Sequence, residues 1–166
     1  MKIVLIGFMA TGKSSVAPIL AGKLGLDVIE MDDLIVEKSG ADSIVEIFEI
    51  GGEPAFRKLE LEVSQDLQHR DNVVISTGGG VVMNTTTMNY LTADAVVVEL
   101  YATLETLIKR ISPKIPRPLF EDVEQAKALY ELRQPLYSKY ATIHVSTDDM
   151  SIDAIANEIV KQVQNL

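Results

Sequence analysis

The stretch from Gly7 to Ser14 has the residue types and the spacing of a phosphate-binding loop. It reads Gly-Phe-Met-Ala-Thr-Gly-Lys-Ser and fits the pattern G-x-x-x-x-G-K-[ST]. Glycines at its two fixed positions permit close approaches that a Cβ would block, so the intervening N–H groups can surround a phosphate. Lys13 can reach the outer phosphates of a nucleotide, and the Ser14 hydroxyl suits a Mg²⁺ ion. The nucleotide-binding residues that we expect here are Gly7, Ala10, Thr11, Gly12, Lys13, Ser14 and Ser15.

The segments on either side of this loop have the character that the motif requires. Residues 2–6 form a short apolar and β-branched run, which is typical of a buried parallel strand. Residues 15–24 carry apolar side chains at helical spacing. A strand, a glycine loop and a helix in this order favour a phosphate site, because the positive end of the helix adds to the attraction.

The balance of charges makes the arginines informative. The chain has 15 Lys and Arg against 24 Asp and Glu, a net charge of −9, which argues against nucleic acid as a partner. A protein this acidic must concentrate positive charge locally wherever it binds an anion. Most of its arginines are therefore expected at the site, namely Arg57, Arg110, Arg117 and Arg133, with Arg70 in a polar turn as the exception.

Length and composition narrow the class of protein. The 166 residues match the usual size of one domain, and we expect a single domain over 1–166. The absence of Cys excludes disulfides, thiolate catalysis and Cys-based zinc sites. No apolar run reaches the length of a membrane span, and a strand follows Met1 so closely that no signal peptide is expected. We therefore expect a cytoplasmic monomer without a membrane partner.

Strands and helices are predicted to alternate along the chain. Apolar runs predict strands at residues 2–6, 27–30, 72–76, 95–100 and 142–145. Helical spacing predicts helices at 15–24, 32–39, 43–48, 53–68, 85–91, 104–111, 123–140 and 152–163, with an interruption or kink at Pro135. This pattern predicts an α/β fold of three layers, in which helices cover both faces of a five-stranded parallel sheet. Ligands of such sheets bind beyond the carboxyl ends of the strands.

Further motifs follow the phosphate-binding loop along the chain. They are Glu30-Met31-Asp32, Phe56-Arg57-Lys58-Leu59-Glu60, Gly78-Gly79-Gly80, Arg117-Pro118-Leu119 and Arg133-Gln134-Pro135-Leu136-Tyr137. With these motifs in this order, the chain resembles the shikimate kinase family over essentially its whole length. The resemblance implies a P-loop kinase fold with a mobile lid, and Mg²⁺ as cofactor. It also implies transfer of the γ-phosphate of ATP to the 3-hydroxyl of shikimate, in the pathway to aromatic amino acids.

The resemblance also implies roles for residues that would bind the substrate, in a region at about 31–61 and beyond. Asp32 would accept the proton of the substrate hydroxyl, although it could also cap the helix that follows. Arg57 and Arg133 would hold the shikimate carboxylate, which a guanidinium fork suits. The backbone N–H groups of Gly78, Gly79 and Gly80 would approach the substrate or the γ-phosphate.

Other implied roles concern the nucleotide and the metal. The segment 112–120, with three prolines, is the expected lid, and Arg117 within it would reach the transferring phosphate. Arg110 would flank the adenine, with residues 147–149 on the other side of the base. The family usually has Asp-x-Asp at the acidic cluster, and its first acid helps to hold Mg²⁺. Glu30 keeps that charge on a longer stem, so Ser14 and Glu30 are the expected metal residues.

Two other functions remain open at this point. A kinase for another small hydroxy acid, such as gluconate, would be favoured if Arg57 and Arg133 did not converge on one pocket. A non-catalytic nucleotide-binding regulator has support only from Glu30, and the retained Lys13, Asp32 and Arg117 argue against it.

Three polar residues receive no functional role from the sequence. His69 and His144 stand alone, without a carboxylate or a second His at ligand spacing, so neither is expected to bind a metal. Glu99 follows an apolar run that superficially resembles a Walker B strand, and we interpret it as a strand-end residue.

Overall fold

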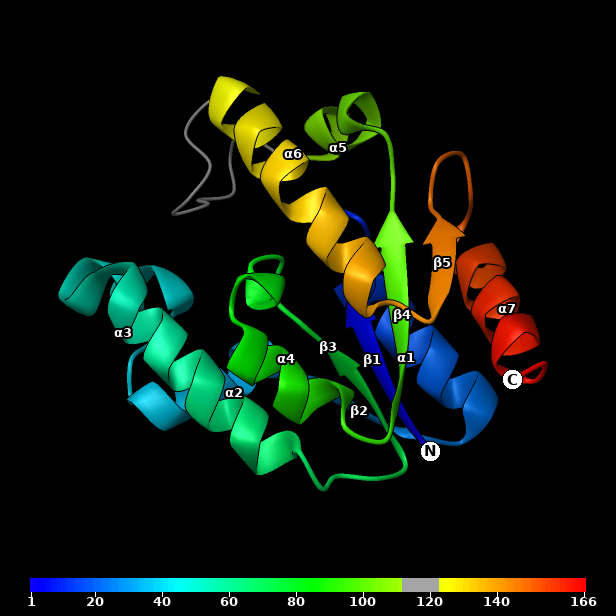
Figure 1. Ribbon diagram of the computed structural model, residues 1–166, viewed down its shortest axis with the longest axis horizontal. Helices are drawn as coiled ribbons and strands as arrows, with labels where there is room; N and C mark the ends of the chain where they lie inside the picture. Colours follow the sequence, from blue (N-terminus) through cyan, green and yellow to red (C-terminus); the bar gives the residue numbers. More distant parts are fainter. Residues whose placement is uncertain (112–122) are drawn as a thin grey trace.

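A parallel sheet lies at the centre of the computed structural model, which describes residues 1–111 and 123–166 (Figure 1). Within these ranges its strands are β1 Lys2–Ile6, β2 Asp27–Glu30, β3 Val73–Ser76, β4 Ala95–Tyr101 and β5 Ile143–Ser146. They are ordered β2-β3-β1-β4-β5, and each neighbouring pair is parallel. All five predicted strands are confirmed, because short buried apolar runs leave little choice of structure.

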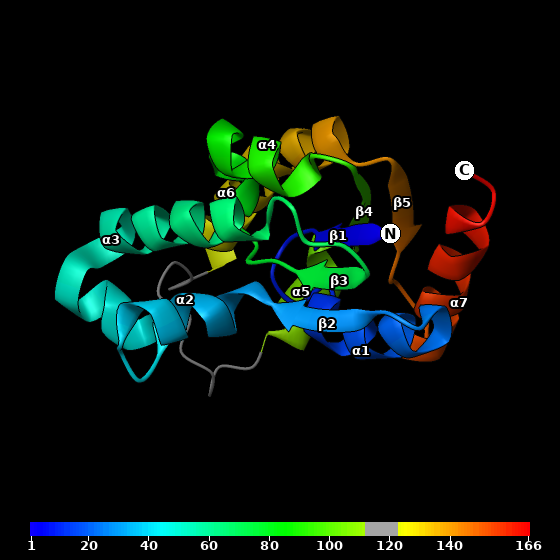
Figure 2. The same ribbon diagram turned by 90° about the horizontal axis from the view of Figure 1, so that it is seen from below.

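Helices connect the strands and cover both faces of the sheet. In the described ranges they are α1 Lys13–Leu24, α2 Met31–Ser39, α3 Ile44–Leu67, α4 Thr85–Thr92, α5 Leu104–Arg110, α6 Val123–Tyr140 and α7 Ile152–Val163, with a 3₁₀ turn, η1, at Val81–Met83. Figure 2 shows α1 and α7 on one side of the sheet, and α4 and α6 on the other. The predicted three-layer α/β architecture is therefore confirmed.

The two faces of the sheet follow from the alternation of side chains along each strand. In β1, Ile3 and Leu5 pack against apolar residues of α1 and α7. Val4 and Ile6 point to the opposite face and pack against residues of α2, α3, α4 and α6. The side chains on both faces of β1 are fully buried, so this strand lies at the centre of the core. The loop that follows β1 therefore begins from a fixed position.

Three details of the helices differ from the predictions. The helices predicted at 43–48 and 53–68 form α3, whose backbone is non-helical at Gly52, with φ 69° and ψ −174°. The helix α6 continues through Pro135 rather than being interrupted there. The turn η1 was not predicted, since three residues are too few for a periodic signal.

The interpretation of Glu99 as a strand-end residue was wrong. Glu99 lies inside β4 with 1% of its surface exposed, not at the strand end. His144 is its register partner on β5, and Nδ1 of His144 lies 2.7 Å from Oε2 of Glu99. His144 therefore has a carboxylate neighbour that sequence spacing alone did not indicate.

Parallel strands bring their carboxyl ends to one edge of the sheet. The phosphate-binding loop follows β1, the acidic cluster follows β2, and the glycine triplet follows β3. The described ranges contain no helix with the length and apolar character needed to cross a bilayer.

Candidate active site

The phosphate-binding loop lies between β1 and α1 and needs its two fixed glycines. An ideal Cβ at Gly7, where φ is 143°, would lie 2.1 Å from the carbonyl oxygen of Leu100. Gly12 has φ 97° and is the N-cap of α1, so the orphan N–H groups of that helix face the loop. Lys13 is 7% exposed, and its Nζ donates to the carbonyls of Gly7 and Phe8 at 2.8 and 3.0 Å. This arrangement is a ready site for the phosphates of a nucleotide.

The other predicted residues of the loop take different positions. The Thr11 hydroxyl donates to the carbonyl of Phe8 at 2.8 Å and closes the loop from inside. Ser15 is exposed in the first turn of α1. Ala10 has φ 64°, in the left-handed region that favours glycine.

Ser14 and Glu30 form an oxygen-rich group beside the loop. The Ser14 hydroxyl lies 3.1 Å from Oε2 of Glu30 and 3.5 Å from the hydroxyl of Ser76. Burial raises the pKa of Glu30, and hydrogen bonds from Ser76 and Ser14 offset only part of that shift. Oε1 of Glu30 is buried and has no hydrogen-bond partner in the described part of the chain.

A carboxylate oxygen that has no hydrogen-bond partner and lies beside a hydroxyl suits Mg²⁺, which prefers oxygen ligands. Residues 1–111 and 123–166 contain no group of three or more His, Cys, Asp or Glu that could hold a metal. Mg²⁺ needs only a few protein ligands when phosphates and waters complete its coordination shell. The residues present therefore fit this ion.

A pocket beside the phosphate-binding loop collects all six predicted substrate residues. It is lined by Met9, Asp32, Ile44, Phe48, Phe56, Arg57, Gly78, Gly79, Gly80 and Arg133. These residues come from the loop after β1, from α2, α3 and α6, and from the loop after β3. Arg57 and Arg133, which are far apart in the sequence, thus converge on one pocket. Because Met9 belongs to the phosphate-binding loop, the pocket adjoins the nucleotide site.

Sequence reasoning did not identify the apolar wall of this pocket. Phe48 and Phe56 stack with ring centroids 5.0 Å apart, and Ile44 and Met9 complete the wall. The spacing of Ile44, Phe48 and Phe56 predicted helices at 43–48 and 53–68 without indicating that these side chains line a pocket. No signal in one sequence separates a pocket wall from a core face.

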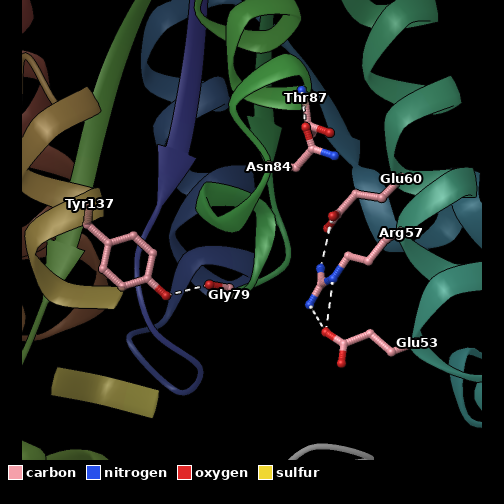
Figure 3. A network of polar contacts seen from close by, with 7 residues as sticks. All are labelled: Glu53, Arg57, Glu60, Gly79, Asn84, Thr87 and Tyr137. Atoms are coloured by element: carbon pink, nitrogen blue, oxygen red, sulfur yellow. Dashed lines mark hydrogen bonds and ion pairs between the residues drawn. The ribbon is translucent and has the colours of Figure 1, made fainter. Parts of the chain in front are cut away.

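Arg57 is held between two glutamates of its own helix, as Figure 3 shows. Its Nη1 donates to Oε2 of Glu60 at 2.9 Å, and its Nε and Nη2 donate to Oε1 of Glu53 at 3.3 and 3.2 Å. Glu60 is 1% exposed, and burial raises its pKa more strongly than the positive charge of Arg57 lowers it. Glu60 therefore sets the direction of the guanidinium from a fixed and buried position.

On the opposite side of the pocket, α6 supplies Arg133 and Tyr137 one turn apart. Arg133 is 3% exposed, and its Nε is buried without a hydrogen-bond partner among the described residues. The Tyr137 hydroxyl donates to the carbonyl of Gly79 (Figure 3), and burial raises the pKa of Tyr137. This contact ties α6 to the glycine triplet.

Asp32 lies in the first turn of α2 and does not cap it. The N-cap of α2 is Glu30, which makes no capping side-chain bond, so the alternative role of Asp32 as a cap is wrong. An ideal Cβ at Gly78 would lie 3.3 Å from Oδ1 of Asp32, so this carboxylate lies against the glycine triplet. The carboxylate of Asp32 thus borders the same pocket as the two arginines.

Arg110 lies at the end of α5 and links two loops. Its guanidinium donates to the hydroxyl and the carbonyl of Thr147 at 2.8 and 2.6 Å, and to the carbonyl of Ala10 at 3.3 Å. Arg110 is therefore placed between the phosphate-binding loop and residues 147–149. Arg117 and the segment 112–120 lie outside the described residues.

Comparison with known proteins settles the family. The family model described as shikimate kinase matches residues 9–164. This chain belongs to the shikimate kinase family. It is 38% identical over 168 residues to the shikimate kinase of Actinobacillus succinogenes, covering 99% of this chain and 95% of that protein. It is 39% identical over 166 residues to the shikimate kinase of Vibrio cholerae, covering 98% and 95%.

Solved structures of shikimate kinases share the fold. Shikimate kinase from Acinetobacter baumannii, in complex with shikimate, superposes with a TM-score of 0.93 at 31% identity, covering 99% of this chain and 93% of that one. The shikimate kinase of Aquifex aeolicus gives 0.87 at 36% identity, covering 99% and 97%. The expected P-loop kinase fold is confirmed, and the chain is a kinase with ATP as its co-substrate.

Proposed function

We propose that this chain transfers the γ-phosphate of ATP to the 3-hydroxyl of shikimate, giving shikimate 3-phosphate and ADP, as a step toward aromatic amino acids. The observation that carries this proposal is the convergence of Asp32, Arg57 and Arg133 on one pocket beside the phosphate-binding loop. An anion-binding pair and a carboxylate fit a substrate with a carboxylate at one end and hydroxyls at the other.

The substrate would be oriented by contacts of three kinds. Arg57 and Arg133 would bind its carboxylate, and Nε of Arg133 is an open donor for this purpose. The rings of Phe48 and Phe56 would cover the apolar face of the substrate ring. The backbone of the glycine triplet would lie against the reacting end, next to Asp32.

The chemistry requires a base and a set of positive groups. Asp32 would take the proton of the hydroxyl, whose oxygen forms a bond to the γ-phosphorus as the bond to the bridging oxygen breaks and ADP leaves. Lys13 and the N–H groups at the start of α1 would neutralise charge on the phosphates. By resemblance to the family, Arg117 would contact the transferring phosphate and Arg110 would lie beside the adenine.

A magnesium ion would be held by Ser14 and Glu30. Their donor atoms fit Mg²⁺, and Oε1 of Glu30 has no other partner among the described residues. When bound, the ion supplies positive charge against the phosphates.

The geometry of the pocket disfavours the two alternative functions. A kinase for gluconate would have been favoured if Arg57 and Arg133 did not meet, and both line the same pocket. A regulator without activity would not need Asp32 at the pocket.

Release of ADP with different acceptors tests the proposal. The chain is supplied with Mg²⁺, ATP and either shikimate, gluconate or no acceptor, and ADP is followed by a coupled assay. We expect release that depends on shikimate and stays at background with gluconate. Release with gluconate would favour the other kinase, and ATP binding without release in any mixture would favour the regulator.

We further propose a cytoplasmic monomer that binds neither nucleic acid nor membranes. The net charge of −9 disfavours a polyanion as partner. Light scattering in solution measures the oligomeric state directly.

A further inference from the structure

Glu99 is a buried carboxylate that the proposed reaction does not use. It lies in β4 with 1% of its surface exposed. Gln134 Nε2 donates to Oε1 at 2.7 Å, His144 Nδ1 lies 2.7 Å from Oε2, and Ser138 Oγ donates to Oε2 at 3.4 Å. Burying a carboxylate is costly unless hydrogen bonds satisfy it, and here both oxygens are engaged. The group thus joins β4, β5 and α6.

Two of these partners stand one turn apart on α6, on either side of Pro135. Proline has no N–H to donate within a helix, and its ring crowds the preceding turn, so α6 is intrinsically weakened at this point. Gln134 and Ser138 contact the same carboxylate from the two sides of the proline. One side chain of the sheet therefore holds both halves of α6.

One of these partners is next in sequence to a residue of the pocket, and the other is next to a residue that contacts the pocket. Arg133 precedes Gln134, and Tyr137 precedes Ser138, so the two pairs form neighbouring stripes on the helix surface. A contact that fixes the rotation of one stripe about the helix axis fixes the other as well.

Apolar residues of α6 also pack against the core, with Tyr137 fully buried and Leu129, Tyr130, Leu136 and Tyr140 partly buried. In the described part of α6, the buried residues are Ala126, Arg133 and Tyr137, of which Arg133 lines the pocket. Leu132 is 55% exposed. The hydrogen bonds of Gln134 and Ser138 to Glu99 add a directional constraint to this packing and are expected to help to set the rotation of α6.

We propose that Glu99 is a positioning residue for substrate binding. Through Gln134 and Ser138 it holds α6 so that Arg133 presents its guanidinium to the pocket and Tyr137 reaches Gly79. His144, whose side chain is 46% exposed, covers the carboxylate from the solvent side. This inference rests on the proposed function, since it takes the carboxylate of shikimate as the group that Arg133 binds.

Steady-state kinetics of Gln134→Leu and Glu99→Gln test the inference. Each variant loses a hydrogen bond to a buried charge, so we expect the KM for shikimate to rise about tenfold. The KM for ATP and kcat should stay within about twofold, because the phosphate-binding loop lies on other elements. The matched control is Glu131→Gln, on the exposed part of α6. The double variant Glu99→Gln plus Gln134→Glu exchanges the two groups, so that an amide again donates to a carboxylate. In this variant the KM for shikimate should return toward that of the wild type.

An unchanged KM for shikimate in both single variants, with only a lower Tm, would show that Glu99 stabilises the fold without positioning the pocket. If Glu99→Gln does not fold, Gln134→Leu decides by the same criterion, because it buries no new charge. Hydrogen exchange of α6 without substrate gives a separate reading, since residues 133–138 should lose protection in both variants. Failure of the wild type to phosphorylate shikimate would overturn the proposed function, whereas unchanged exchange would overturn the role of Glu99.

Discussion

The guanidinium of Arg57 occupies the space that a side chain at Gly80 would need. An ideal Cβ at Gly80 would lie 2.2 Å from Nη2 of Arg57 and 2.9 Å from its Cζ. The glycine triplet and the arginine are therefore one structural unit, although they lie on different elements. Glu60 holds the other edge of the guanidinium at 2.9 Å, so the group has little freedom to move away.

Gly80→Ala should displace Arg57 and weaken shikimate binding. We expect the KM for shikimate to rise at least about tenfold, as for the loss of one charged hydrogen bond. The KM for ATP should change little. Gly22→Ala is the control, because a Cβ at this exposed position in α1 would meet no atom within 4 Å. A normal KM for shikimate in Gly80→Ala would contradict the role assigned to Arg57.

Asp32→Asn should reduce kcat by about 10² or more, because the amide cannot accept the proton of the hydroxyl. Binding of ATP, measured by calorimetry, should remain close to that of the wild type. Asp33→Asn removes an adjacent but exposed carboxylate and should leave kcat nearly unchanged. If ATP binding falls as far as turnover in Asp32→Asn, the residue has a structural role instead.

Arg57→Ala and Arg133→Ala should each weaken shikimate binding by about 1.5–3 kcal/mol, the usual range for charged hydrogen bonds. The exposed Arg70 supplies the control variant, Arg70→Ala. The methyl ester of shikimate should bind the wild type poorly and lose much less affinity in the two pocket variants. Equal binding of acid and ester to the wild type would exclude a carboxylate clamp.

Glu30→Gln should raise the Mg²⁺ concentration needed for half-maximal rate, since it keeps the shape but removes the charge. The KM for shikimate should be much less affected, because Glu30 does not line the substrate pocket. Glu30→Asp retains the charge and should keep substantial activity. An unchanged Mg²⁺ dependence in Glu30→Gln would mean that Ser14 and the phosphates hold the ion without this carboxylate.

The raised pKa of Glu60 predicts how stability depends on pH. The contribution of Glu60 to the free energy of unfolding is present in full below the ordinary pKa of a glutamate and is lost as pH rises through its raised folded value. Glu60→Gln lacks this titration, so its Tm relative to the wild type should increase as pH rises above the ordinary pKa of a glutamate. The control is Glu49→Gln, exposed on the same helix. A relative Tm that decreases over this range would mean that attraction to Arg57 outweighs burial.

Most of the fold could be predicted because its strands are short apolar runs that only a buried parallel sheet accommodates. The helix boundaries differ from the predicted ones where a loop residue determines where the helix begins or bends. The helix α1 begins at Lys13 rather than at the predicted Ser15, since Gly12 already serves as its N-cap. The two segments of α3 are joined without a connecting loop, because Gly52 alone, in a left-handed conformation, changes the chain direction.

The pocket residues could be predicted from motifs, whereas their partners could not. Arg57 has acidic residues nearby on one helix, and its rotamer decides which of them it contacts. Glu99 and His144 become neighbours only through the pairing of β4 with β5. The order of strands in the sheet was not available from the sequence, so the contact between these two residues was not predicted.

The position of the transferred phosphate on shikimate is the most direct test of the proposed activity. Wild-type chain is incubated with ATP, Mg²⁺ and shikimate, and the product is examined by phosphorus NMR with proton coupling retained. We predict one new phosphate monoester whose phosphorus couples to the proton on the carbon that bears the 3-hydroxyl, formed in equal amount to ADP. A monoester at another hydroxyl, or ADP formed without any monoester, would contradict the proposed function.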